Sequence, residues 1–123
     1  MVPRAKVTLR GLLPSLALSI LVACGSDDAS PVASIKVYKH RGSVQCGDRG
    51  TPPEVMRRGL TDAGITVLSY SCGHDGLVRA AVCGISDGFI NIFEIPASQA
   101  DGAVSLSFLP LTALATAAEV PCP

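Results

Sequence analysis

Apolar and polar positions along the latter part of the chain follow strand-like and helix-like repeats. Residues 34–40 (SIKVYKH) alternate apolar and polar side chains, which predicts a strand with one partly exposed face. Residues 65–71 (ITVLSYS) are apolar on both faces for four positions, which is typical of a central strand. Residues 89–95 (FINIFEI) are β-branched and aromatic and predict a third strand, which Pro96 ends.

Residues 51–64 (TPPEVMRRGLTDAG) carry the signals of a helix. Thr51 is a suitable N-cap, and Pro52 falls at the first helical position, where its missing donor costs nothing. Glu54 lies three residues after the cap and completes a capping box. Gly64 can end the helix in the left-handed conformation. The order strand, helix, strand then predicts a right-handed βαβ unit.

The remaining segments complete the predicted fold. The second and third strands are joined closely enough to favour antiparallel pairing, as a hairpin with a long tip. Residues 97–108, with Ser98 as a cap, predict a second helix, and the alanine-rich residues 109–118 predict a short helical turn. We therefore expect an α/β (α+β) fold: one domain, residues 34–123, built as a small two-layer β-α-β-β-α sandwich with its helices on one face.

The start of the chain has a different pattern. The first ten residues hold three basic side chains and no acidic one: Arg4, Lys6 and Arg10. An apolar run of about a dozen residues follows at 11–22, against the ~20 that cross a bilayer. A basic segment followed by a short apolar run is typical of a secretory signal peptide, which we expect to occupy residues 1–23.

Residues 21–24 (Leu, Val, Ala, Cys) end the apolar run and resemble the lipobox of bacterial lipoproteins. The resemblance implies cleavage before Cys24, a diacylglycerol thioether on its sulfur and acylation of the new amino group; two or more acyl chains such as palmitate give a stable membrane anchor. Gly25 and Ser26 follow without an intervening Asp, so the resemblance points to the outer membrane. The alternative is ordinary cleavage after Ala23, which leaves Cys24 as a free thiol.

Residues 24–33 are small, polar and acidic, and they predict a flexible tether between anchor and domain. Within the domain, residues 91–96 (NIFEIP) resemble a strand of small exported bacterial proteins that contain cysteines. This resemblance carries no activity over to the present chain.

Loss of the signal segment changes the charge of the protein. Residues 1–23 contain three of the ten basic residues and none of the ten acidic ones, so seven positive and ten negative groups remain, a net charge of −3. This balance argues against nucleic acid as a partner and against electrostatic attraction to anionic lipid. We therefore expect membrane contact through the lipid anchor, with an envelope protein as a further partner.

Four cysteines follow Cys24, an even number that predicts two disulfides in an exported domain. Three pairings exist. We favour Cys72–Cys83, which closes a local glycine-rich excursion and leaves Cys46–Cys122 to tie the carboxyl terminus to the body. The longer loop would contribute ~4 kcal/mol in the chain-entropy model.

The same cysteines raise two chemical alternatives. Cys46 follows a strand and precedes a helix, as the reactive thiol of a thioredoxin-like protein does, but a Cys-x-x-Cys pair is absent and the helix begins too far away to lower the pKa of the thiol. Cys46, Cys72, His74 and Cys83 could be drawn as a zinc site, yet the paired ligand spacings are absent. We expect structural disulfides and neither metal nor cofactor.

The loop of residues 41–50 is a candidate anion site, because it follows a strand and precedes a helix. Two arginines and two glycines carry the argument: Arg41, Gly47, Arg49 and Gly50. Against a phosphate, Pro52 and Pro53 lack backbone donors, and Glu54 brings a negative charge to the same helix end.

Ser71, His74 and Asp75 are the remaining candidates, for nucleophilic or acid–base catalysis. Closeness in sequence is not the geometry of a triad, and a solvated Gly-His-Asp-Gly turn explains them equally well. We therefore expect a non-catalytic, lipid-anchored envelope protein that binds a ligand or supports an assembly. The alternative is a thiol–disulfide redox accessory or a small periplasmic enzyme that uses Cys46.

Overall fold

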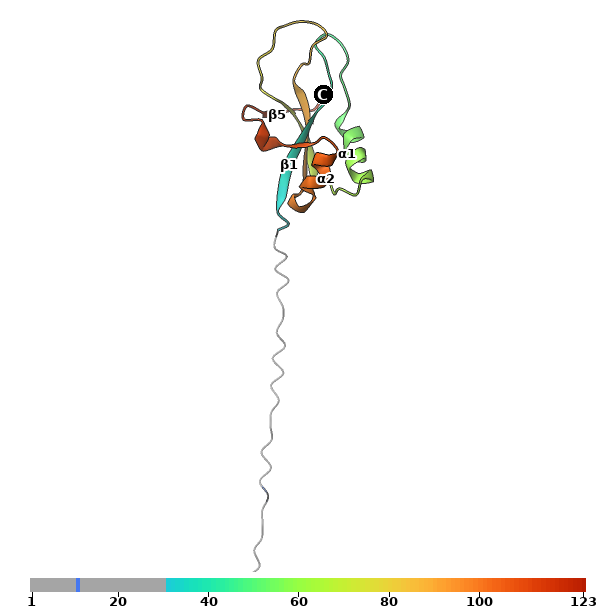
Figure 1. The fold of residues 1–123 in the computed structure, drawn as a ribbon, viewed down its shortest axis with the longest axis vertical. Coiled ribbons are helices and arrows are strands. Elements are labelled where there is room, and N and C mark those ends of the chain that lie inside the picture. Colours follow the sequence, from blue (N-terminus) through green and yellow to red (C-terminus); the bar gives the residue numbers. More distant parts are fainter. Residues whose placement is uncertain (1–10, 12–30) are drawn as a thin grey trace, which may run out of the picture.

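The computed structural model describes Gly11 and residues 31–123. Five strands form one antiparallel sheet in the order β4-β1-β3-β2-β5, with helices packed on it (Figure 1). In chain order the elements are β1 (Ser34–His40), α1 (Pro53–Asp62), β2 (Ser69–His74), β3 (Phe89–Pro96), the 3₁₀ helix η1 (Ala97–Gln99), α2 (Ala100–Ser105), β4 (Leu109–Pro110), the 3₁₀ helix η2 (Leu111–Ala113) and β5 (Ala118–Val120). The predicted mixed α/β fold is confirmed.

Strand β3 is the central strand. Its side chains are buried on both faces of the sheet: Ile90, Ile92, Phe93 and Ile95. Phe93 pairs with Val37 of β1 on one side and with Tyr70 of β2 on the other, antiparallel to both. The hairpin predicted between β2 and β3 is confirmed. Because β3 lies between β1 and β2, these two strands run in the same direction without pairing, and the predicted βαβ unit is split.

Strand β2 begins later than its sequence pattern predicts, and it lies in the sheet between β3 and β5. The prediction placed a strand at residues 65–71, whereas β2 starts at Ser69. Ile65 is buried because it packs against α1, and the Thr66 N–H donates a hydrogen bond to Oε1 of Gln99 at 2.7 Å. The apolar side chains that suggested a two-faced strand therefore belong in part to the connection between helix and strand.

The sheet separates two hydrophobic clusters. The larger one lies between the sheet and both helices: Val37, Met56, Leu60, Ile65, Phe93, Ile95, Ala103 and Phe108. The smaller one lies on the opposite face, where the segment that contains η2 covers it: Tyr38, Ile90 and Ile92, with Leu111, Leu114 and Ala117 packed against them. The helices share one face of the sheet, as predicted, and the C-terminal segment protects the other.

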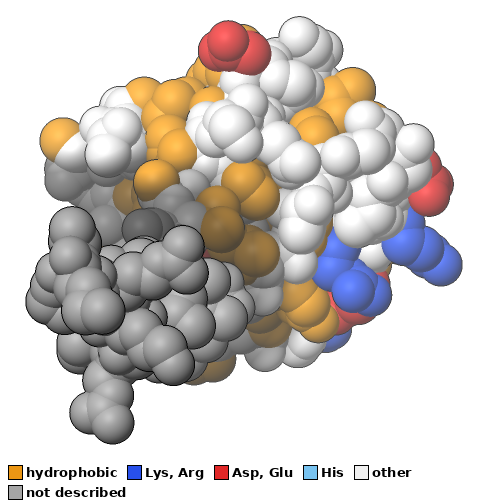
Figure 2. Space-filling view, turned by 90° about the horizontal axis from the view of Figure 1, so that it is seen from below, with side chains coloured by type: hydrophobic (Ala, Val, Ile, Leu, Met, Phe, Trp, Pro, Cys, Tyr) orange, Lys and Arg blue, Asp and Glu red, His pale blue; other side chains and the backbone are white. Residues whose placement is uncertain are grey.

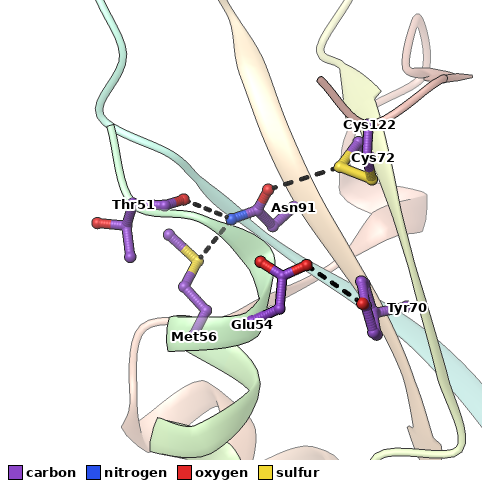
Figure 3. The surroundings of a disulfide bond; sticks show 7 residues. All are labelled: Thr51, Glu54, Met56, Tyr70, Cys72, Asn91 and Cys122. Carbon is purple, nitrogen blue, oxygen red and sulfur yellow. Dashed lines mark hydrogen bonds between the residues drawn. A yellow bond between two sulfur atoms is a disulfide. The ribbon is translucent and has the colours of Figure 1, made fainter. Parts of the chain in front are cut away.

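Helix α1 begins one residue later than predicted, and its capping box does not form. Pro52 occupies the N-cap position in an extended conformation, and no side chain caps the helix. The carboxylate of Glu54 accepts a hydrogen bond from the hydroxyl of Tyr70 at 3.2 Å instead of returning to Thr51 (Figure 3). The predicted cap is wrong. Thr51 contributes its backbone carbonyl oxygen instead, which accepts a hydrogen bond from Nδ2 of Asn91.

The end of α1 is as predicted. Gly64 has a φ of 83°, in the left-handed region. The N–H of Gly64 donates to the carbonyl of Thr61, and the N–H of Ile65 donates to the carbonyl of Leu60. This pair of bonds is the Schellman motif, and it places Ile65 against Leu60 in the larger cluster.

The C-terminal third contains two short edge strands that the sequence pattern did not predict. The helix expected at residues 97–108 is divided into η1 and α2 and ends at Ser105, and the helical turn expected at 109–118 shortens to η2. Strand β4 pairs with β1, and β5 pairs with β2. Strands of two or three residues are too short to show an alternating pattern.

Two disulfides join the four downstream cysteines, as predicted, but the favoured pairing is wrong. Cys46 is bonded to Cys83, and Cys72 is bonded to Cys122. Cys72 lies in the buried part of β2, beside Asn91 (Figure 3). Cys83 lies in the loop between β2 and β3, which forms the hairpin tip. Pairing of β5 with β2 brings the C-terminal segment to Cys72, which explains why the carboxyl terminus is tied there.

Figure 2 views the molecule from the end at which β1 begins. Basic side chains gather on the side where α1 lies, and Arg57 and Arg58 of that helix are exposed. The guanidinium of Arg57 lies over the ring of Tyr70, 5.9 Å from its centroid. Neither of these two arginines lines the pocket described in the next section.

Candidate functional site

Buried polar side chains gather at the end of the sheet where β1 and β2 finish and β3 starts, which is the upper end in Figure 1. Arg41 and Ser43 directly follow β1, and Asp75 directly follows β2; all three are buried. The predicted candidates from the loop of residues 41–50 and from the Gly-His-Asp-Gly turn are therefore brought to the same end of the molecule.

The carboxylate of Asp75 is fully buried and is surrounded by hydrogen-bond donors. Arg79 donates to both carboxylate oxygens, at 2.8 and 2.6 Å, and the N–H of Leu77 donates to Oδ1 at 3.0 Å. Nε2 of His40 lies 2.9 Å from Oδ2. The hydrogen bonds from Arg79, joined by that from His40, hold the pKa of Asp75 well below its usual range, although burial acts in the opposite direction. Asp75 is therefore a charged anchor for two loops and a strand end.

The segments that contain Gly88 and Thr116 pack closely against Asp75 and complete this network. Gly88 has a φ of 80°, and a Cβ atom there would lie 2.5 Å from Nη1 of Arg79 and 2.8 Å from Oδ1 of Asp75. The carbonyl of Gly88 accepts from the N–H of Asp75 at 2.9 Å, and the hydroxyl of Thr116 donates to the carbonyl of Asp75 at 2.8 Å. Only glycine fits at position 88, because any other residue would displace the Arg79–Asp75 pair.

His74 uses both ring nitrogens. The N–H of Gly76 donates to Nδ1 at 2.9 Å, so Nδ1 is an acceptor, and Nε2 donates to the carbonyl of Asp87 at 2.8 Å. Nδ1 lies 3.8 Å from Oδ1 of Asp75. Ser71 lies three residues earlier in β2, so its side chain points to the opposite face of the strand. The three predicted catalytic candidates are thus not brought together as nucleophile, base and orienting acid.

The pairing of His40 with Asp75 was not predicted from the sequence. The two residues are 35 positions apart, but both lie at the ends of strands that run in the same direction on either side of β3. The available signal was weak: His40 ends one predicted strand, but Asp75 lies four residues beyond the end of the other, which was predicted at residues 65–71. The His40 ring also packs edge-on against Tyr38, with 5.8 Å between the ring centroids.

A pocket with a volume of about 260 Å³ lies next to this network. Its walls come from three parts of the chain: Arg41, Ser43, Arg49, Asp87, Phe89, Pro121 and Pro123. Two of the four residues predicted as an anion site, Arg41 and Arg49, therefore lie on one pocket. Gly47 does not line it, and Gly50 packs against the backbone of Arg41.

Arg41 is held in place by its backbone and is 7 % exposed. Its N–H donates to the carbonyl of Phe89 at 3.1 Å, and its own carbonyl accepts from the N–H of Thr51 at 2.7 Å. Gly50 has a φ of 70°, and a Cβ there would lie 2.2 Å from the Arg41 carbonyl oxygen, so only glycine lets the loop approach so closely. Among the residues that the structure describes, Nε of Arg41 is the one buried side-chain nitrogen or oxygen without a hydrogen-bond partner.

No protein-family model, curated protein or solved structure matches this chain.

The cysteines considered for redox or zinc chemistry lie in two separate disulfides. Cys46 and Cys83 are both exposed, and Cys46 has a φ of 61° in the loop before α1. Cys72 is bonded to Cys122 in the other disulfide, and His74 is engaged as described. Within residues 31–123, no group of three His, Cys, Asp or Glu side chains is arranged to hold a metal ion.

Asn91 is a buried polar residue whose burial the sequence pattern does not predict, because the polar residues of a strand are expected to face solvent. Figure 3 shows its side chain pointing from β3 toward the start of α1. Nδ2 donates to the carbonyl of Thr51 at 2.9 Å and lies 3.3 Å from Sδ of Met56. Oδ1 lies 4.0 Å from Sγ of Cys72, a contact without a proton because that sulfur is bonded to Cys122. Asn91 fastens the helix to the sheet.

Cys24 and the predicted signal segment, apart from Gly11, lie outside the described residues. Of the helices in the part of the chain that the structure covers, none has the length and apolar character needed to cross a membrane.

Proposed function

We propose that the chain is an exported protein of the cell envelope, anchored by lipid at Cys24 and facing the periplasm from the outer membrane, with a binding role and no catalytic one. The observation that carries the proposal is the pairing of every cysteine downstream of Cys24 in a disulfide. Such bonds form and persist outside the cytosol. The basic and apolar segment before residues 21–24 supplies the route of export.

The loop end of the sheet favours binding over catalysis. Asp75 is held by Arg79 and His40 in a network that ties segments of the protein together. The pocket beside it has Arg41 on its wall with an unpartnered Nε. The side chains of Asp75, Arg79 and His40 satisfy one another and stabilise the fold, whereas the guanidinium groups of Arg41 and Arg49 take part in no ion pair of the described residues and favour an anionic ligand.

The anchor is tested by Cys24→Ser in the full chain expressed in a Gram-negative bacterium. We expect the variant to lose labelling by radioactive palmitate and to move from the membrane pellet to the soluble fraction, because a hydroxyl does not form the thioether. Labelling, fractionation and the mass of the amino-terminal peptide are the measurements.

The matched control is Ser30→Ala, which changes a small polar side chain in the same segment and leaves the sulfur in place. This variant should label and pellet like the unchanged chain. Undiminished labelling of the Cys24→Ser protein, or an intact amino terminus on the unchanged chain, contradicts the proposal.

A thiol–disulfide redox accessory is a second candidate, and the exposure of both Cys46 and Cys83 favours it. In such a role a partner dithiol would give two electrons and two protons to this disulfide and become oxidised itself. The redox role predicts a reduction potential above about −230 mV, measured by equilibration with glutathione buffers and alkylation. A potential below about −300 mV marks a structural disulfide and excludes the redox role.

A further inference from the structure

The guanidinium of Arg41 carries a buried positive charge that takes part in no ion pair of the described residues. An arginine side chain stays charged in proteins, and removal of an unpaired charge from water is costly. Arg41 is 7 % exposed, and its Nε has no partner among the described residues. The ion pairs of the described residues involve Asp75 and Glu119, and neither Arg41 nor Arg49 takes part in one.

One acidic side chain, Asp87, stands on the same pocket wall, and it is already engaged. Its Oδ1 accepts from the hydroxyl of Ser43 at 2.6 Å and from the N–H of Phe89 at 3.1 Å. Arg41 and Arg49 bring two positive charges against this single carboxylate, so the side chains that line the pocket carry a net charge of +1. This excess of guanidinium over carboxylate side chains favours an anionic ligand.

The other walls are apolar. Phe89 is 37 % exposed, and the edge of the His74 ring packs against it with 5.4 Å between the centroids, which fixes the orientation of the Phe89 ring. Pro121 and Pro123 supply two further apolar surfaces. The volume of about 260 Å³ lies just below the ~300–1,000 Å³ of pockets that hold drug-sized ligands, so the ligand is small.

Phosphate fits these walls less well than a carboxylate does. A phosphate site is usually built from several backbone N–H groups at a helix start, and Pro52 and Pro53 at the start of α1 have none. The second charge of a phosphate would also face Asp87. A carboxylate takes the parallel N–H bonds of one guanidinium and leaves its apolar body to the ring and the prolines.

We propose that this pocket binds a small organic monocarboxylate with an aromatic or apolar body, held by Arg41 with help from Arg49 and packed on Phe89, Pro121 and Pro123. The inference rests on the binding role proposed above and names the class of ligand.

The test is a titration of the full-length, disulfide-bonded, ¹⁵N-labelled protein with benzoate, followed by NMR. We expect saturable shifts of the Arg41 side-chain Nε–H signal and of the Phe89 amide. Benzamide, which has the same ring and no charge, and inorganic phosphate should produce no saturable shift at these signals. Arg41→Gln should weaken benzoate binding about tenfold or more, because it removes the two-bond contact.

Arg58→Gln is the matched control, since Arg58 is an exposed arginine of α1 away from the pocket. This variant should bind benzoate like the unchanged protein. If Arg41→Gln fails to fold, Arg49→Gln changes an exposed residue of the same wall and should weaken binding severalfold. Absent saturation with benzoate, an equal response to benzamide, or unchanged binding by the pocket variants overturns the inference. Palmitate labelling of Cys24 is independent of these results, so failure of the pocket and failure of the anchor are distinguishable.

Discussion

Asp75 shows at the scale of one residue how the loops are held. It is the buried acidic residue of the described chain, and its partners come from the end of β1 and from the loop that follows β2. The sequence pattern predicted one turn that contains His74 and Asp75, and it predicted that this turn is exposed to solvent. The missing information was spatial, because Arg79 neutralises the carboxylate from within the loop and His40 reaches it from another strand.

Asp75→Asn is expected to lower the free energy of unfolding at pH 7 by about 2–4 kcal/mol, since it leaves Arg79 and His40 without a charged acceptor. Urea unfolding followed by circular dichroism measures the loss. Asp62→Asn, at an exposed position of α1, is the matched control and should change stability by less than about 0.5 kcal/mol. Equal losses in the two variants would refute the role given to Asp75.

The same substitution predicts a pH dependence. The pKa of Asp75 in the folded protein lies below its value in the unfolded chain, ~3.9, so its charge stabilises the fold fully above about pH 5. That contribution decreases as the pH falls below about 4. The gap in stability between the unchanged protein and Asp75→Asn should therefore narrow between pH 7 and pH 2. A constant gap would show that the charge of Asp75 is not the cause.

At the scale of the element, long regular patterns were predictable and short pairings were not. Strand β3 could be predicted from its run of apolar residues, and the end of α1 could be predicted from Gly64. Burial requires apolar side chains, and the left-handed conformation favours glycine, so both features can be recognised in the local sequence. Strands β4 and β5 have two and three residues and exist because β1 and β2 offer free edges. The same pairing decides the disulfides: β5 delivers Cys122 to Cys72, which no spacing along the chain reveals.

Cys122→Ser tests the attachment of β5 to β2. The lost bond spans 50 residues and contributes about 4 kcal/mol in the chain-entropy model, so we expect the melting temperature to fall by at least about 8 °C. Alkylation after unfolding, followed by peptide mass spectrometry, should find the free thiol at Cys72 and none at Cys46. A free thiol at Cys46 would instead support the pairing that the sequence favoured.

The double variant Cys46→Ser with Cys83→Ser is the matched control, because it removes the other disulfide and leaves no unpaired sulfur. It should keep Cys72 bonded to Cys122. Scrambled disulfides in this control would count against two independent bonds.

At the scale of the whole molecule, the fold class and the shared face of the helices followed from the sequence, whereas the order of the strands did not. Strand β3 lies between β1 and β2 and is antiparallel to both, so β1 and β2 finish at the same end of the sheet. This arrangement joins Arg41, Asp87 and Phe89 around the pocket. Arg41 and Arg49 could be predicted together because they share a loop, but no pattern in the sequence indicates that Pro121 and Pro123 line the same pocket.

Residues 121–123 make the shape of the pocket depend on the oxidation state of one cysteine pair. Pro121 and Pro123 flank Cys122, whose sulfur holds them to the sheet. A chain with free thiols at Cys72 and Cys122 lacks the covalent bond that holds Pro121 and Pro123 at the pocket. Under the proposed binding role, ligand recognition would then depend on formation of the Cys72–Cys122 bond.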